Sequence, residues 1–173
     1  MVMSVSSSIS SGQVLHRPYA HGEARLIVRE MTDLLVLDLV EKRLVTDQLV
    51  LTVGYDIDNL TNPEIRKKYK GEITTDHYGR SVPKPAHGTV NLDRQTSSTK
   101  LIMDAVIGLY DRIVNPNLLV RRVTIVANRL VEEGTAAEKQ VYEQLTLFTD
   151  YDALQKERKE ESEALEKERR LQE

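Results

Sequence analysis

Hydrophobic and polar positions alternate in four short segments of the chain, and in two longer segments the apolar positions recur every three to four residues. Alternation is typical of a half-buried β-strand, whereas the longer spacing is typical of an amphipathic helix. The predicted strands cover residues 8–15, 47–55, 86–93 and 118–129. The predicted helices cover residues 23–43 and 96–114, the second of which opens with capping residues in the stretch TSSTK.

The elements follow the order β-α-β-β-α-β, which is an α+β pattern. Each helix has one apolar stripe and each strand has one apolar face. A four-stranded, mostly antiparallel sheet with both helices on one face buries these surfaces and leaves the other face open. We expect this domain over residues 6–130, a linker over 131–149, and a charged tail, helical or disordered, over 150–173.

Segment 56–85 follows neither period. It contains three prolines and the basic run RKKYK at 66–70. A structureless loop of this length is unusual in a compact domain, so the segment is either a functional loop or a long hairpin. The stretch GEITTDHYGRSVP favours a short hairpin around Tyr78 and Gly79.

The alternation in the strands predicts which side chains line the open face. From the last strand, the side chains expected to face the helices are Leu119, Val123, Ile125 and Ala127. Those left for the open face are Arg122, Thr124 and Asn128, joined by Thr89 and Asn91 from the third strand and by serines from the first. Such donors suit phosphate oxygens, and the start of the second helix suits an anion. A polar, solvated sheet face is also common, so both interpretations stay open here.

Charge is divided unevenly along the chain. Residues 1–130 hold 17 Lys and Arg against 14 Asp and Glu, whereas residues 131–173 hold 7 against 13. The mildly basic front is weak evidence for a nucleic-acid partner. The chain has no cysteine, which excludes a disulfide framework, a thiolate metal site and a cysteine nucleophile. We expect no signal peptide and no membrane span.

No group of side chains has the spacing of a catalytic or metal site. The histidines lie in connections or at a strand start, at positions 16, 21, 77 and 87. The stretches YDIDN at 55–59 and DHYGR at 76–80 bring carboxylates together, and we interpret both as turns. We therefore expect no catalytic residue, metal or cofactor in this chain.

Several segments together carry a family resemblance, among them SSGQVL, EARLIVREMTDLLVLDL, AHGTVNL, TSSTKLI and LLVRRVTIVAN. Over residues 6–130 their order and spacing resemble the C-terminal little-finger domain of Y-family translesion DNA polymerases of the UmuC/DinB (ImpB/MucB/SamB) type. The resemblance implies that the open face lies along the DNA backbone in the major groove. The DNA contacts expected on this basis are Ser10, Ser11, Thr89, Asn91, Ser97, Ser98, Lys100, Arg121, Arg122 and Thr124, with extra contacts at Arg66, Lys67, Lys68, Arg80 and Lys84.

The stretch QLTLF at 144–148 contains the single phenylalanine of the chain. It resembles the bacterial sliding-clamp-binding pentapeptide Gln-Leu-x-Leu-Phe, with Gln144, Leu145, Leu147 and Phe148 at the matching positions. Such a peptide needs an amide for the rim of a pocket and apolar anchors for its groove. The alternative is a short amphipathic segment that folds back on the domain.

The resemblance implies a module of an error-prone, lesion-bypass DNA polymerase in bacterial DNA repair, located in the cytoplasm with the nucleoid. Its partners would be primer-template DNA, the sliding clamp and the rest of the parent polymerase. Nothing in the sequence resembles a palm, fingers or thumb domain, so polymerase activity and its Mg²⁺ would belong to the parent protein. Two other classes stay open: a protein-interaction adaptor with no DNA role, and a small metabolic enzyme, which would need a pocket of convergent ionisable groups.

Overall fold

The computed structural model of the chain describes residues 8–134 together with Glu166, Lys167 and Arg169. These residues belong to two units, Met1–Glu133 and Gly134–Glu173. In the second unit the three residues described beyond Gly134 are helical and exposed. The first unit holds the sheet, the long helices and the candidate site. Among the described residues, no helix has the length and apolar character that crossing a membrane requires.

The main sheet is antiparallel in every pairing. Its long strands lie in the order β1 (Ser8–Tyr19), β6 (Val120–Asn128), β2 (Leu44–Tyr55) and β5 (Ala86–Thr96). A short strand, β7 (Val131–Glu132), pairs with the start of β2. The four long strands confirm the predicted ones with shifted ends. The sequence does not predict β7, because two residues are too few to show a period.

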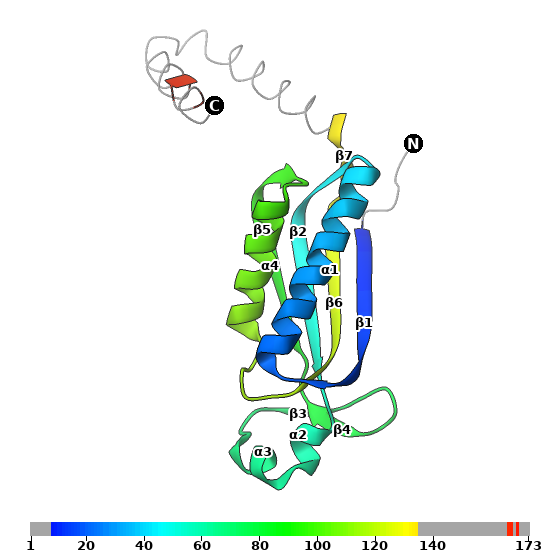
Figure 1. Ribbon diagram of the computed structural model, residues 1–173, viewed down its shortest axis with the longest axis vertical. Coiled ribbons are helices and arrows are strands. Elements are labelled where there is room, and N and C mark those ends of the chain that lie inside the picture. The colour runs from blue at the N-terminus through cyan, green and yellow to red at the C-terminus, as the bar shows by residue number, and fades with distance from the viewer. Residues whose placement is uncertain (1–7, 135–165, 168, 170–173) are drawn as a thin grey trace. The chain divides into compact units, whose positions relative to one another are not determined.

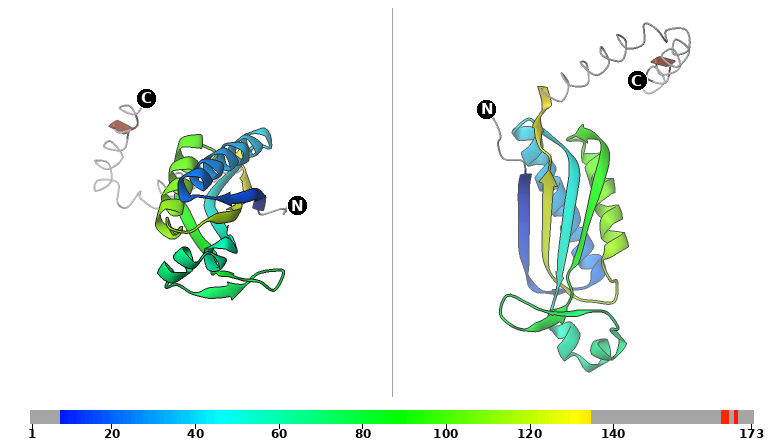
Figure 2. Two further views of the ribbon diagram at one scale, coloured as in Figure 1. Left: turned by 60° about the horizontal axis from the view of Figure 1, so that its bottom comes forward. Right: turned by 180° about the vertical axis from the view of Figure 1, so that it is seen from behind.

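Two long helices, α1 (His21–Glu41) and α4 (Thr99–Ile113), lie side by side across one face of the sheet (Figure 1). The view from behind in Figure 2 shows the sheet in front of both helices, so its other face is open. The buried apolar stripes of the helices are Ala24, Val28, Met31, Leu35, Val36 and Leu39 in α1, and Ile102, Met103, Val106, Ile107, Leu109 and Tyr110 in α4. They pack on the inner face of the sheet, as predicted, and form one core.

A β-bulge interrupts the alternation at the start of β6. Arg122 pairs with Gly54 and Val120 pairs with Tyr55, so Arg121 is an extra residue between them. Val120 and Val123 are consequently both buried, and Leu119 is only half-buried. The prediction that Leu119 belongs to the helix-facing set was wrong, because strict alternation does not extend through a bulge.

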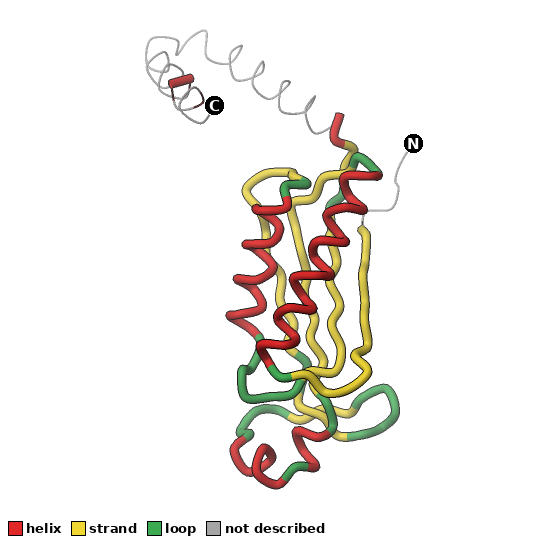
Figure 3. Tube along the Cα trace, in the orientation of Figure 1, coloured by secondary structure: helices red, strands yellow, loops and turns green. Residues whose placement is uncertain are grey.

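Segment 56–85 is an ordered insertion at one end of the sheet (Figure 3). It contains the short helices α2 (Asp58–Thr61) and α3 (Pro63–Lys68), followed by the hairpin of β3 (Ile73–Thr75) and β4 (Ser81–Pro83). The hairpin confirms the prediction around Tyr78 and Gly79, whereas neither short helix was predicted. The Asn62 side chain caps α3 by accepting the N–H of Glu64 at 3.0 Å, and Pro63 occupies its first turn.

Buried Asn59 attaches this insertion to the sheet. Its Nδ2 donates to the carbonyls of Asp56 and Leu119 at 2.9 and 2.8 Å, and its Oδ1 accepts the N–H of Leu119 at 2.7 Å. The stretch YDIDN turns only at Asp56 and Ile57, because Tyr55 ends β2 and Asp58 begins α2, and it joins the insertion to the residue before β6. This joint fixes where the hairpin can lie.

Candidate nucleic-acid interface

The open face of the sheet carries its side chains in rows that cross the strands. The strand register places Gln48 between Asn128 and Asn91. Asn128 Nδ2 donates to Gln48 Oε1 at 3.1 Å, and Gln48 Nε2 donates to Asn91 Oδ1 at 2.9 Å. The three amides form a ladder over three strands, which fixes their orientation. Each NH₂ group keeps at least one N–H for a ligand.

The next two rows combine hydroxyl and apolar side chains. One row is Ser10, Val126, Val50 and Thr89, and the other is Gly12, Thr124, Thr52 and His87. Thr52 Oγ1 and His87 Nδ1 are hydrogen-bonded at 2.8 Å. A Cβ on Gly12 would lie 3.6 Å from Thr124 Oγ1, so the glycine leaves that hydroxyl uncovered from β1. These rows supply hydrogen-bond donors and acceptors along the open face.

The two adjacent arginines of β6 have different surroundings. Arg121 Nη1 lies 3.5 Å from Oδ1 of the buried Asp56. Arg122 is exposed, lies opposite Gly54, and forms no ion pair with any residue from 8 to 134. Arg122 is therefore the better placed of the two to bind a phosphate, whereas Arg121 holds the insertion through Asp56.

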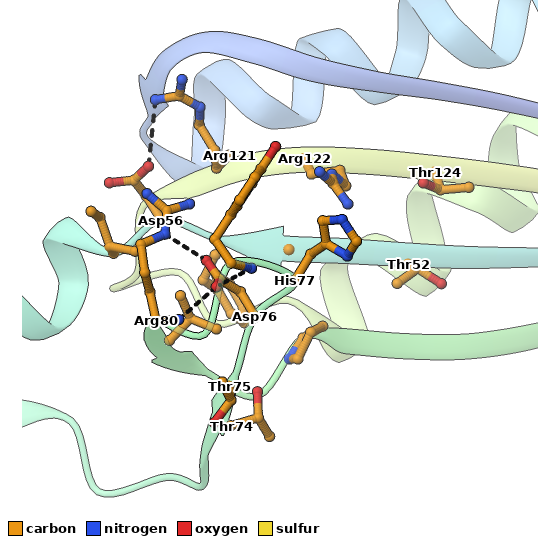
Figure 4. Close-up of a pocket in the computed structure, with 16 residues that line it drawn as sticks. Thr52, Asp56, Thr74, Thr75, Asp76, His77, Arg80, Arg121, Arg122 and Thr124 are labelled. Atoms are coloured by element: carbon orange, nitrogen blue, oxygen red, sulfur yellow. Dashed lines mark hydrogen bonds and ion pairs between the residues drawn. The ribbon is translucent and has the colours of Figure 1, made fainter.

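The hairpin of the insertion and the nearby end of the open face line a solvent-open cavity of about 270 Å³ (Figure 4). The main sheet lines it with Thr52, Gly54, Tyr55, Arg121, Arg122 and Thr124. The hairpin lines it with Thr74, Thr75, Asp76, His77, Tyr78, Arg80 and Val82, and Asp56, Ile57 and Pro85 complete the wall. The cavity thus joins segments that are far apart in the sequence.

The carboxylate of Asp76 organises the tip of this hairpin. Its Oδ1 accepts the N–H groups of Tyr78 and Arg80 at 2.9 and 2.8 Å, and its Oδ2 accepts Arg80 Nε at 2.9 Å. Burial opposes the charge on Asp76, but the Arg80 and Tyr78 donors outweigh it and lower the pKa of this carboxyl. Gly79 adopts φ +78°, which favours glycine. The prediction of a turn at DHYGR is confirmed.

Some of the predicted contacts lie away from this face. Ser11 pairs with the buried Ile125 and so has the register of the helix side, whereas Ser10 has that of the open face. Ser97, Ser98 and Lys100 lie where β5 passes into α4, at the opposite end of the sheet from Arg122. The hydroxyl of Ser98 accepts the N–H of Leu101 at 3.3 Å, so it caps its own helix.

The cations of the insertion are also divided. Arg80 forms an ion pair with Asp76 at 2.9 Å, and Lys84 forms one with Glu72 at 3.1 Å. Arg66, Lys67 and Lys68 are exposed in the last turn of α3, where a positive charge complements the helix dipole.

Several other side chains on this surface were not predicted from the sequence. Gln48 and Thr52 follow the same alternation as the predicted residues, and His87 lies two positions before Thr89, so a consistent use of alternation would have found them. Asp56 and Asn59 had no such signal, because their roles depend on contacts with Arg121 of β6 and with Leu119, the residue before β6.

The residues of QLTLF, Gln144, Leu145, Leu147 and Phe148, lie outside the described residues. Within the described part of the chain, no group of three or more His, Asp or Glu side chains is arranged to hold a metal ion.

Comparison with known proteins identifies a family for this chain. The model of the impB/mucB/samB family C-terminal domain matches residues 6–147. No curated protein matches the chain.

Two solved structures are similar to the chain at low identity. The complex of the beta-clamp processivity factor and little finger domain of PolIV matches with a TM-score of 0.42 and 8% identity, over 70% of this chain and 86% of that chain. The insertion ternary complex of Dbh DNA polymerase matches with a TM-score of 0.42 and 7% identity, over 72% of this chain and 29% of that chain. Neither likeness is strong enough to support a functional argument.

Proposed function

Because the chain belongs to the impB/mucB/samB family, as a C-terminal domain of that family, we propose that it is the DNA-binding and clamp-tethering module of an error-prone, lesion-bypass DNA polymerase. The module holds primer-template DNA through its sugar-phosphate backbone in the bacterial cytoplasm. Nucleotide transfer and the Mg²⁺ it requires are assigned to the parent polymerase rather than to this chain.

The open face of the sheet is the observation that carries the DNA-binding proposal. It presents an amide ladder, two rows with hydroxyl groups and the exposed Arg122. Side-chain amides, hydroxyls and arginine are the groups that commonly contact phosphate and sugar, and these contacts carry no sequence information. We therefore expect binding to duplex DNA with little sequence preference.

Charge reversal on the two sides of the sheet tests this proposal. Arg122→Glu should weaken duplex binding about tenfold or more, because a charge-assisted hydrogen bond contributes about 1.5–3 kcal/mol. The matched control is Arg29→Glu, the same charge change at an exposed position of α1 on the helix side. Fluorescence anisotropy with a labelled duplex measures both. Equal affinities for wild type and Arg122→Glu would refute the open face as the DNA surface.

The tethering part of the proposal rests on QLTLF at 144–148. Binding to the clamp would raise the effective concentration of the polymerase at the primer end. Titration with a bacterial sliding clamp should give micromolar-range binding that Leu147→Ala and Phe148→Ala both abolish, while duplex DNA affinity is retained. Clamp binding that survives both changes would exclude this motif. An adaptor without a DNA role predicts instead that DNA binding is absent or insensitive to salt.

A further inference from the structure

The cavity between the hairpin and the open face is small and open to solvent. Its volume of about 270 Å³ lies just below the usual range for small-molecule sites of about 300–1,000 Å³. A cavity of this size suits a small ligand such as one nucleotide.

Aromatic side chains stand at the hairpin tip. Tyr78 is 72% exposed although it lines the cavity. The ring of His77 packs edge-on against it at 5.3 Å, and the Arg80 guanidinium lies 5.1 Å from the Tyr78 ring centroid. An exposed aromatic ring held on a hydrogen-bonded turn is a stacking platform for an unpaired base.

Of the three arginines that line the cavity, two form ion pairs with nearby carboxylates and one is available to a ligand. Arg80 is paired with Asp76 and Arg121 with Asp56, whereas Arg122 forms no ion pair with the rest of residues 8–134. The hydroxyls of Thr52 and Thr124 line the same wall as Arg122. One guanidinium with neighbouring hydroxyls suits a single phosphate.

The cavity also lies where the open face ends. β2 ends at Tyr55, β6 begins at Val120 and β5 begins at Ala86, and the insertion follows at this edge. DNA that lies along the open face passes the hairpin as it leaves the sheet. The ring faces of bases inside a duplex are covered by their stacked neighbours, whereas an unpaired base of a single-stranded extension is free to stack on Tyr78.

We propose that this cavity binds one unpaired nucleotide of a single-stranded DNA extension, with its base stacked on Tyr78 and with Arg122 at the phosphate that joins this nucleotide to the last base pair of the duplex. The inference rests on the proposed function, since it takes the open face to hold the adjoining duplex. It adds a site that distinguishes a primer-template junction from continuous duplex.

Binding to two labelled DNAs tests the proposal, one a blunt duplex and the other the same duplex with a 5′ single-stranded extension. The full 173-residue chain is used with Tyr78→Ala and Tyr78→Phe. Wild type should prefer the extended DNA, and Tyr78→Ala should lose about tenfold in affinity for it, equivalent to about 1.4 kcal/mol of stacking. Tyr78→Phe keeps the ring and should keep the preference. Affinity for the blunt duplex should stay within about twofold in both variants, since the bases inside a duplex are already stacked on one another and the duplex carries no unpaired nucleotide for the cavity.

The possible failures are distinguishable. If wild type binds both DNAs equally, or if Tyr78→Ala weakens both equally, the nucleotide site is refuted and the duplex-binding function stands. If wild type binds neither DNA, both proposals are refuted. Photo-crosslinking from 5-iodouracil in the extension gives a second readout, because a stacked base should crosslink to Tyr78. Crosslinks confined to other residues would overturn the assignment of the base.

Discussion

Replacing Asn59 tests whether the insertion is attached to the sheet as the structure indicates. Asn59 is fully buried, and its side chain makes three hydrogen bonds to the backbone of Asp56 and Leu119. The Asn59→Ala change removes all three and leaves the Leu119 N–H without the acceptor it has at 2.7 Å. The two carbonyls are less affected, because each also accepts a backbone N–H.

The size of the effect follows from these contacts. A net contribution of about 1 kcal/mol for each hydrogen bond gives about 3 kcal/mol, and an unsatisfied buried donor alone costs about 1–3 kcal/mol. We expect Asn59→Ala to lower the free energy of unfolding by about 2–4 kcal/mol.

Urea denaturation followed by circular dichroism measures this loss. The matched control is Asn117→Ala, because Asn117 is exposed near the same loop and its side chain forms no hydrogen bond with the described residues. The control should stay within about 0.5 kcal/mol of wild type. A loss below about 0.5 kcal/mol in Asn59→Ala would show that the three hydrogen bonds do not hold the insertion in place.

Two further predictions concern the packing of the helices. Gly88→Val should lower the free energy of unfolding by about 1–3 kcal/mol, because even a Cβ at Gly88 would lie 2.9 Å from Leu109 Cδ1; denaturation that matches wild type would contradict this. The Arg25 guanidinium, which donates to both Asp111 oxygens at 2.9 and 3.0 Å, lowers the pKa of that carboxyl. Wild type should therefore be more stable than Asp111→Asn above about pH 4, the usual pKa of a carboxyl in the unfolded chain, and should lose the advantage as the pH falls through the lowered pKa. A stability difference that stays constant from pH 7 to pH 2 would contradict this.

The layered arrangement of the core could be predicted from the sequence alone. The periods of two and of three to four residues identified the long strands and helices, because a buried stripe or face imposes its period on the sequence. The family match confirms the resemblance to the little-finger domain of Y-family polymerases. The hairpin was predicted from its turn residues instead. Asp76 accepts backbone N–H groups of the turn and Gly79 adopts a positive φ, so both residue types are typical of a tight turn.

The remaining features depend on contacts between distant segments. The bulge at Arg121 has no local sequence signal, and it shifted the predicted facing of Leu119. The ion pair of Arg121 with Asp56 and the hydrogen bonds of Asn59 exist only once the insertion meets β6. The cavity at the hairpin has the same origin, so its lining could not be assembled from the sequence.

The salt dependence of duplex DNA binding tests the central claim most directly. If the open face holds DNA through phosphates, the logarithm of the affinity should fall linearly with the logarithm of salt concentration, with little difference between unrelated duplex sequences. Arg122→Ala should reduce the magnitude of that slope by about one, because one phosphate contact is lost. An affinity independent of salt, or an unchanged slope in Arg122→Ala, would contradict the account.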